Sequence, residues 1–278
     1  MDRQQTTHKR YLSMQTKPRI SSILETNNLS QSITGVKAFN LSELKLKEEL
    51  QFELPSQLRL GHLVEKIISN LIQSSTNYKV LYENIQVIKD KKTLGEIDFI
   101  IKNQRNEQII HLELAYKFYL YDPNISEHAF NNWVGPNRND SLKEKLEKLK
   151  NKQFPLLHHN FTQSILPDVA INEVSQSLCF LVSLFIPYQC KRTYAPSYAK
   201  AIKGYYLNLD AFIKMDHALK SYYLPTKNEW GMDPADNEIW TDFEGIVKQA
   251  ESIIQEKQAT LCWQKHKQSY LTFFIVWW

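Results

Sequence analysis

The chain has 278 residues, of which 42% are hydrophobic and 12% aromatic, and its formal net charge is +4. This composition excludes a disordered polyelectrolyte, because enough apolar side chains are present to build a large core. It also excludes a protein whose whole body is basic, since the first 40 residues contain six Lys or Arg against two Asp or Glu and therefore account for the net charge.

The predicted elements begin after residues 1–17, a polar stretch without apolar periodicity that we expect to be a flexible tail. Apolar residues at helical spacing then predict an amphipathic helix over 58–74. Three stretches rich in β-formers follow, and the polar turns between them predict an antiparallel meander. The strands of this meander are expected at 78–88, 94–101 and 108–117.

A second helix is predicted from Asp140 or Ser141, either of which can cap it, to about residue 152. The later elements are expected to be strands at 176–187 and 204–209, a helix at 242–258 and a strand at 269–278. Because helices and strands are interspersed along the chain, this order predicts one α/β domain over 18–278. We expect a mixed central sheet that is flanked by helices.

Carboxylates occur among apolar residues on two neighbouring predicted strands. Side chains alternate between the two faces of a strand, so Glu96 and Asp98 share one face of 94–101, and Glu113 lies on one face of 108–117. An unpaired carboxylate that is buried there costs several kcal/mol. We therefore expect a compensating cation, which is a lysine, an arginine or a divalent metal.

Oxygen ligands from two strands suit Mg²⁺ or Mn²⁺, and Glu65 on the polar side of the first helix offers a further acid. A metal held in this way lowers the pKa of an attacking water and neutralises charge on a phosphate. The alternative interpretation is structural: Asp98 and Glu113 form cross-strand salt bridges on an exposed sheet face, with Lys117 as their partner.

The spacing of these acids makes the sequence recognisable. The stretch Gly95-Glu96-Ile97-Asp98-Phe99-Ile100 precedes His111-Leu112-Glu113-Leu114-Ala115-Tyr116-Lys117, and fourteen residues separate Asp98 from Glu113. These motifs resemble the PD-(D/E)XK nuclease core, and in particular the bacterial domain-of-unknown-function family 1853, which is grouped with that superfamily. The resemblance is dense over 58–155, where Arg59-Leu60-Gly61 and Trp133-Val134-Gly135-Pro136-Asn137 support it.

The resemblance implies a restriction-endonuclease-like fold and phosphodiester hydrolysis that depends on Mg²⁺ or Mn²⁺, with DNA preferred to RNA as the substrate. Asp98 and Glu113 match the two metal-binding acids, and Glu65 matches the acid of the first helix. Lys117 is the candidate for the motif lysine, although the usual lysine lies two residues after the acid, where this chain has Ala115. On a regular strand Lys117 lies roughly 13 Å beyond Glu113.

This displaced lysine keeps a second hypothesis open, in which a catalytically degenerate nuclease fold binds nucleic acid or a protein partner. A third hypothesis is a structural domain whose acids form salt bridges. Salt-dependent nucleic-acid binding without metal-dependent cleavage would favour the second hypothesis over the first.

Several further residues are candidates for contacts with a substrate, and each also has a structural interpretation. Glu96 and His111 share strand faces with the acids, where they could bind the metal or phosphate or be ordinary paired residues. Trp133 could stack on a base and Arg138 could clamp a phosphate near a helix N-terminus, or both could belong to an ordinary capped loop. The stretch 188–205 contains no acid and interleaves tyrosines with cations, which suits a nucleic-acid groove or a basic surface loop. Its candidate contacts are Lys191 and Arg192.

The membrane and compartment signals are weak. The longest apolar runs, at 178–187 and 271–278, are too short to span a bilayer and fit buried strands. The polar N-terminal stretch has no signal-peptide pattern, and the three widely spaced cysteines fit neither a zinc site nor a disulfide framework. We therefore expect a cytoplasmic protein without membrane contact. The sequence predicts no oligomeric state.

Overall fold

The computed structural model describes residues 16–47, 50, 54–55 and 58–278, so the predicted tail over 1–17 lies almost wholly outside the described residues. The chain divides into two compact units, each assembled from separate stretches. The first contains Asn28–Tyr116 and Glu144–Leu181 with the N-terminal stretch, and the second contains Ser21–Asn27, Lys117–Lys143 and Val182–Trp278. The single domain expected over 18–278 stays a prediction.

The first unit contains the predicted amphipathic helix, observed as α3 (Leu60–Gln73). Its buried residues recur at helical spacing, from Leu63 and Val64 to Leu71 and Ile72, because only one face of the helix contacts the sheet. This face packs against the strand that follows it, β2 (Tyr78–Lys89).

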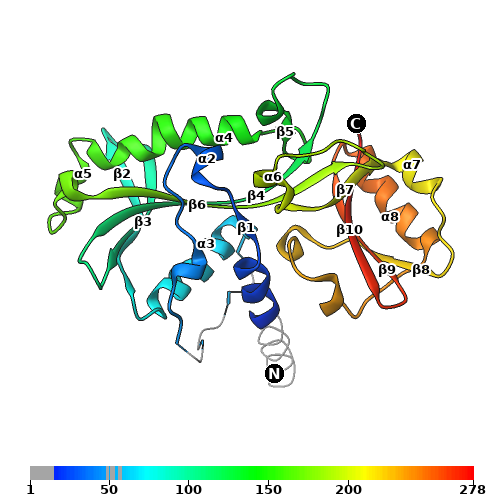
Figure 1. Cartoon of the computed structure of the whole chain (residues 1–278), viewed down its shortest axis with the longest axis horizontal. Helices are drawn as coiled ribbons and strands as arrows, with labels where there is room; N and C mark the ends of the chain where they lie inside the picture. The colour runs from blue at the N-terminus through cyan, green and yellow to red at the C-terminus, as the bar shows by residue number, and fades with distance from the viewer. Residues whose placement is uncertain (1–15, 48–49, 51–53, 56–57) are drawn as a thin grey trace. The chain divides into compact units, whose positions relative to one another are not determined.

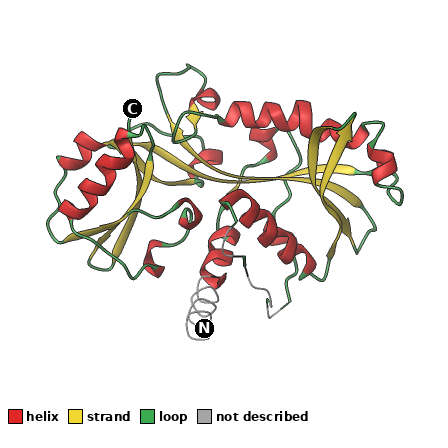
Figure 2. Ribbon diagram, turned by 180° about the vertical axis from the view of Figure 1, so that it is seen from behind, coloured by secondary structure: helices red, strands yellow, loops and turns green. Residues whose placement is uncertain are grey.

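The predicted meander is confirmed as β2, β3 (Lys92–Asn103) and β4 (Ile109–Tyr121), which pair antiparallel in sequence order. Strand β6 (Ser175–Pro187) is the next neighbour of β4. Both β4 and β6 are long and contribute residues to the two units. Figures 1 and 2 show α3 on one side of the meander and the helical run that begins at α4 on the other.

That helical run changes geometry twice. It begins as α4 (Leu142–Lys148), continues as the π-helical turn η3 (Leu149–Gln153) and ends as the 3-10 turn η4 (Phe154–His158). Pro155 explains the change, because it has no N–H to donate and its ring clashes with the carbonyl one helical turn earlier. The run packs against β3, where a Cβ on Gly95 would lie only 2.6 Å from Leu156 Cδ1.

Besides β5 (Trp133–Val134) and the ends of β4 and β6, the second unit contains a run of four strands in the hydrogen-bonded order β7-β10-β9-β8. Their bounds are Ile202–Asn208 for β7, Ser269–Val276 for β10, Thr260–His266 for β9 and Lys220–Tyr223 for β8. Helices α7 (Leu209–Ile213) and α8 (Phe243–Gln255) pack on these strands through a core that includes Phe212, Ile246 and Phe273. The sequence predicted β7, β10 and α8 but not β8, β9 and α7.

The sheet is mixed, because β7 pairs parallel with both β6 and β10, whereas the β2–β3, β3–β4 and β9–β10 pairs are antiparallel. The predicted α/β class is therefore confirmed, with a mixed sheet flanked by helices that is consistent with a restriction-endonuclease-like core. Among the helices of the described residues, none combines the length and apolar character that crossing a bilayer requires. The remaining elements are a helical stretch over 16–24, β1 (Asn27–Asn28), α2 (Gln31–Thr34), η1 (Leu41–Glu43), η2 (Ala129–Asn132), β5 (Trp133–Val134), α5 (Thr162–Ile165), η5 (Ile171–Glu173), α6 (Pro196–Ala199), η6 (Lys227–Glu229) and η7 (Pro234–Asp236).

Candidate functional site

The two motif acids lie where strands β3 and β4 stop pairing. The hydrogen-bonded register ends at Phe99 opposite Leu112, and the next residue on each strand is an acid, Asp98 on β3 and Glu113 on β4. Like charges directly opposite each other destabilise a sheet. Instead of continuing the ladder, the Asp98 carboxylate accepts a hydrogen bond from the backbone N–H of Leu114 at 2.8 Å. The acids thus belong to one site rather than to a regular strand pair.

Both acids are buried, since Asp98 is 9% exposed and Glu113 is 0% exposed. Each oxygen of Glu113 has its own hydrogen-bond partner. His111 Nε2 lies 2.7 Å from Oε1, and the side-chain amide of Gln153 donates to Oε2 at 2.8 Å. These contacts hold the carboxylate in one orientation without placing a positive charge on it, provided that His111 is neutral.

The surroundings of His111 make it neutral. The side chain is fully buried, and this burial lowers the pKa of His111 to about 4. The amide nitrogen of Gln176 lies 3.2 Å from His111 Nδ1 and also donates to the Phe154 carbonyl at 2.7 Å. Because Nδ1 accepts from that amide, the ring proton is on Nε2 and is donated to Glu113. His111 was a candidate from the sequence, whereas Gln176 was not.

Burial raises the pKa of both motif acids. The pKa of Asp98 rises to about 8, mainly through desolvation and then through the charge of Glu113. The pKa of Glu113 also rises to about 8 through desolvation, although the charges of Lys145 and Lys148 counteract part of this rise. Two acids that repel each other in a buried site bind a proton or another cation readily.

The cations that act on this site come from helix α4, which contains none of the candidate residues predicted from the sequence. Lys145 lowers the pKa of both Asp98 and Glu113, and Lys148 lowers that of Glu113. Lys145 is partly buried, whereas Lys143 on the same helix is exposed. The sequence contains a signal that points to Lys145. This residue lies three residues after Leu142 and four before Leu149, and this spacing places it on the buried face of the helix. The same spacing signal applies to Gln153, which follows the buried Leu149 by four residues.

Glu65 and Glu96, the two other predicted acids, lie close enough for their charges to act on the motif acids. The charge of Glu65 raises the pKa of Asp98, and the charge of Glu96 raises that of Glu113. Glu65 is also 3.0 Å from His62 on the same helix, and Glu96 accepts a long hydrogen bond, 3.5 Å, from Gln86. Over the described part of the chain, no three or more His, Cys, Asp and Glu side chains group closely enough to hold a metal ion.

Lys117 and Arg138 belong to ion pairs of the second unit. Lys117 donates to Asp140 at 2.6 Å, and Arg138 donates to Asp122 at the same distance. The Arg138 guanidinium also lies 4.3 Å from the ring centroid of Trp278. Both cations were candidates for the catalytic or phosphate-binding group, and the structure gives both of them an acidic partner inside their own unit.

Trp133 lies inside the second unit rather than at its surface. The side chain is fully buried, and its ring packs near Tyr121, Tyr194 and Tyr198 at centroid distances between 4.9 and 6.0 Å. A buried ring has no open face on which a base can stack, so the indole acts in this structure as a core side chain.

The two basic candidates near this cluster are exposed. Arg192 lies over the Tyr121 ring at 5.2 Å, and Lys191 precedes it in the same exposed loop. Placement at the surface leaves both cations accessible to an anionic partner.

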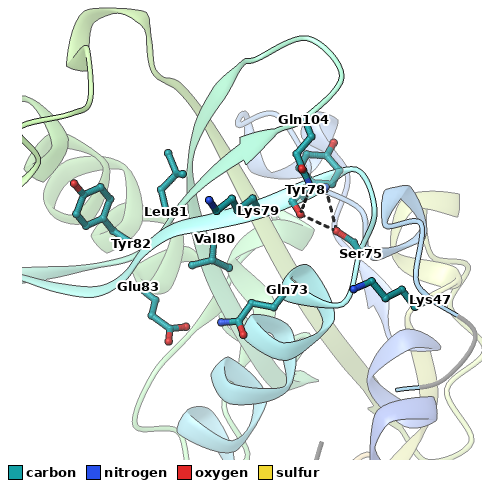
Figure 3. Close-up of a pocket in the computed structure, with 10 residues that line it drawn as sticks. All are labelled: Lys47, Gln73, Ser75, Tyr78, Lys79, Val80, Leu81, Tyr82, Glu83 and Gln104. Carbon is teal, nitrogen blue, oxygen red and sulfur yellow. Dashed lines mark hydrogen bonds between the residues drawn. The ribbon is translucent and has the colours of Figure 1, made fainter. Parts of the chain in front are cut away.

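A surface cavity of about 570 Å³ lies in the first unit, between the end of α3 and strand β2 (Figure 3). Gln73 and Glu83 extend toward it on one side of the strand, and Ser75 hydrogen-bonds the backbone of Tyr78 at its edge. Neither Asp98 nor Glu113 lines this cavity, so we do not assign it to the carboxylate site. Its lining residues are Lys47, Gln73, Ser75, Tyr78, Lys79, Val80, Leu81, Tyr82, Glu83 and Gln104.

Comparison with known proteins gives a family but no activity. No curated protein and no solved structure matches the chain. One family, described as Domain of unknown function (DUF1853), matches residues 7–270 and thus nearly the whole sequence. This family is the one that the motif set around Asp98 and Glu113 resembles. The chain therefore belongs to the DUF1853 family.

Proposed function

We propose that this protein is a divalent-metal-dependent nuclease that hydrolyses phosphodiester bonds, with DNA preferred to RNA. One observation carries the proposal: Asp98 and Glu113 are buried at the point where two strands part, and Glu113 is held there by neutral donors. Burying two carboxylates costs desolvation free energy. A domain that needed only salt bridges would lose less of this free energy by placing them on an exposed sheet face. A divalent cation would relieve the repulsion between the acids.

The donor set suits Mg²⁺ or Mn²⁺, because both ions prefer oxygen ligands and carboxylates above all. Asp98 and Glu113 would hold the ion, and Glu65 would add negative charge nearby. When bound, such an ion lowers the pKa of an attacking water and neutralises charge on the phosphate. His111 and Gln153 orient the Glu113 carboxylate, as second partners of metal ligands commonly do.

In this proposal Lys145 takes the role of the motif lysine, for which Lys117 was the candidate. Its charge reaches both carboxylates, and its partly buried position on α4 limits screening by water. A lysine in this place stabilises the negative charge that develops on the phosphate during hydrolysis. We further propose that the protein acts in the cytoplasm and that Lys191 and Arg192 contact the nucleic-acid backbone.

The decisive experiment is a cleavage assay with the purified full chain, Mg²⁺ or Mn²⁺, and single-stranded, duplex and branched DNA and RNA. We expect cleavage that EDTA abolishes and that Asp98→Asn reduces below detection. Asp140→Asn is the matched control, because it removes an acidic charge from an ion pair of the second unit. If no substrate is cut, or if Asp98→Asn cuts as well as the wild type, the nuclease proposal is wrong.

A second candidate function is nucleic-acid binding without cleavage. It is favoured by the pairing of Lys117 with Asp140, which gives the only lysine of strand β4 a structural partner. Binding that weakens steeply with salt and needs no divalent metal, together with no cleavage, would support this alternative.

A further inference from the structure

The side-chain amide of Gln153 has one atom with a partner and one without. Its nitrogen donates to Glu113 Oε2 at 2.8 Å. Its oxygen, Oε1, is fully buried, and it has no hydrogen-bond partner among the residues that the structure describes. A buried acceptor without a donor costs about 1–3 kcal/mol. Asn132 Oδ1 and Gln264 Oε1 are also buried without a partner in the described part of the chain, so the Gln153 oxygen is distinguished by the contact of its amide with the motif acid Glu113.

The amide cannot simply be turned around to remove the problem. Glu113 is ionised when a cation is bound, and both of its oxygens are then acceptors, so in that state the atom of Gln153 that faces Glu113 must be the nitrogen. The oxygen is then left beside the carboxylate, in the same buried site. Gln153 is also the last residue of the π-helical turn η3, and such turns occur often at functional sites.

We propose that Gln153 Oε1 is the third protein ligand of the divalent cation, together with Asp98 and Glu113; this inference rests on the proposed metal-dependent function. Amide oxygens are common ligands of hard divalent cations. A ligand of this kind also explains why no group of three His, Cys, Asp or Glu side chains is found in the described residues, since the third oxygen comes from an uncharged side chain.

Two roles of Gln153 have to be separated, because it could act only as a donor that orients Glu113. Gln153→Met removes both the donor and the oxygen while keeping a similar length. Gln153→Glu removes the donor but keeps an oxygen in the same place. If Gln153 only orients Glu113, both variants lose metal affinity; if Oε1 is a ligand, Gln153→Glu binds the metal at least as tightly as the wild type.

The experiment is a titration of the metal-free full chain with Mn²⁺, followed by isothermal calorimetry and by the electron paramagnetic resonance signal of free Mn²⁺. We expect one site in the wild type, no binding by Asp98→Asn, and an affinity about 10-fold to 100-fold lower in Gln153→Met. The matched control is Gln86→Met, because Gln86 is an exposed glutamine that also donates to a glutamate. Circular dichroism and thermal unfolding show whether each variant is folded.

The outcomes separate this inference from the proposed function. Weakened binding in Gln153→Met with recovery in Gln153→Glu supports the ligand assignment, even if the wild type cuts no nucleic acid. Equal Mn²⁺ affinity in the wild type and Gln153→Met overturns the assignment and leaves the nuclease proposal intact. A loss of affinity in both Gln153→Met and Gln153→Glu has the same meaning. No Mn²⁺ binding by the wild type overturns the assignment and the metal dependence together.

Discussion

The buried carboxylates of the two units are stabilised in different ways. In the second unit, the side chain of Asp122 is 8% exposed and receives a charged hydrogen bond from Arg138 at 2.6 Å. In the first unit, Glu113 is at least as deeply buried, but the side chains that donate to it are those of a neutral histidine and an amide. Asp98 accepts from a backbone N–H.

This difference distinguishes a structural acid from a candidate functional acid. A buried carboxylate with its own cation is already compensated, and its charge supports the fold. A buried pair without full compensation retains a raised pKa, as Asp98 and Glu113 do, and therefore has affinity for a proton or a metal ion.

The largest effect is expected from Lys145, whose charge partly compensates the Asp98–Glu113 pair. Lys145→Met should lower kcat/KM for nucleic-acid cleavage about 100-fold, because it removes a positive charge from a site with limited screening. Lys143→Met is the matched control on the same helix, where the side chain is exposed, and it should leave kcat/KM within about twofold. Steady-state cleavage rates provide the measurement. Equal losses in the two variants would mean that the helix contributes only general positive charge.

The case of Lys145 also shows what the sequence could and could not predict. Strong periodicity was sufficient for α3, the β2–β3–β4 meander, β6 and α8, since each has a clear apolar face or a continuous apolar run. The spacing of Asp98 and Glu113 was sufficient to find the two acids. Strand β9 was missed because its sequence, Thr260–His266, mixes buried polar residues with apolar ones and lacks a simple alternation.

The partners of the acids could not be predicted, because they come from distant parts of the chain. Gln153 and Gln176 reach the site from a helical turn and from strand β6, and a glutamine has no local pattern that marks it as functional. Lys117 was chosen because it is close to Glu113 in sequence. Lys145 is farther away in sequence, and only the packing of α4 brings its charge to the acids.

The second prediction concerns metal binding and pH. Below pH 8 the Asp98–Glu113 pair retains protons that a metal ion must displace, so apparent affinity should rise with pH up to about 8. A cation at about 100 times its Kd stabilises the folded state by about 2.7 kcal/mol, which raises Tm by several degrees. We expect the Tm increase caused by Mg²⁺ to be larger at pH 8 than at pH 6.5. Asp98→Asn should show none, and an equal increase at both pH values would contradict the raised pKa.

The stability of the metal-free protein should depend on pH through the same buried acids. The raised pKa of Asp98 means that the folded state holds a proton that the unfolded state has lost between about pH 4 and pH 8, so stability falls as pH rises through this window. The lowered pKa of His111 acts in the opposite direction, but only below its ordinary value of 6.5. Between pH 6.5 and pH 8, the pH dependence of stability therefore reports on the buried acids without a contribution from His111.

In that range Asp98→Asn should stabilise the metal-free protein at pH 8 by on the order of 1 kcal/mol and flatten its pH dependence. The amide oxygen can still accept from the Leu114 N–H. Asp122→Asn should instead destabilise it by about 1–3 kcal/mol, because Arg138 loses a charged partner. Urea unfolding in EDTA measures both. Destabilisation by Asp98→Asn at pH 8 would show that its charge is compensated after all.

The smallest effect is expected for Lys117, the residue that sequence spacing favoured. Its side chain is 36% exposed and that of its partner Asp140 is 40% exposed, so this surface ion pair contributes about 0–1 kcal/mol. Lys117→Met should therefore change the free energy of unfolding by less than about 1 kcal/mol and leave cleavage within about twofold. Urea unfolding and the cleavage assay test both parts. If Lys117→Met lost as much activity as Lys145→Met, Lys117 on strand β4 would be the catalytic lysine. An ion pair with an acid would then not be sufficient to identify a lysine or arginine of this protein as structural.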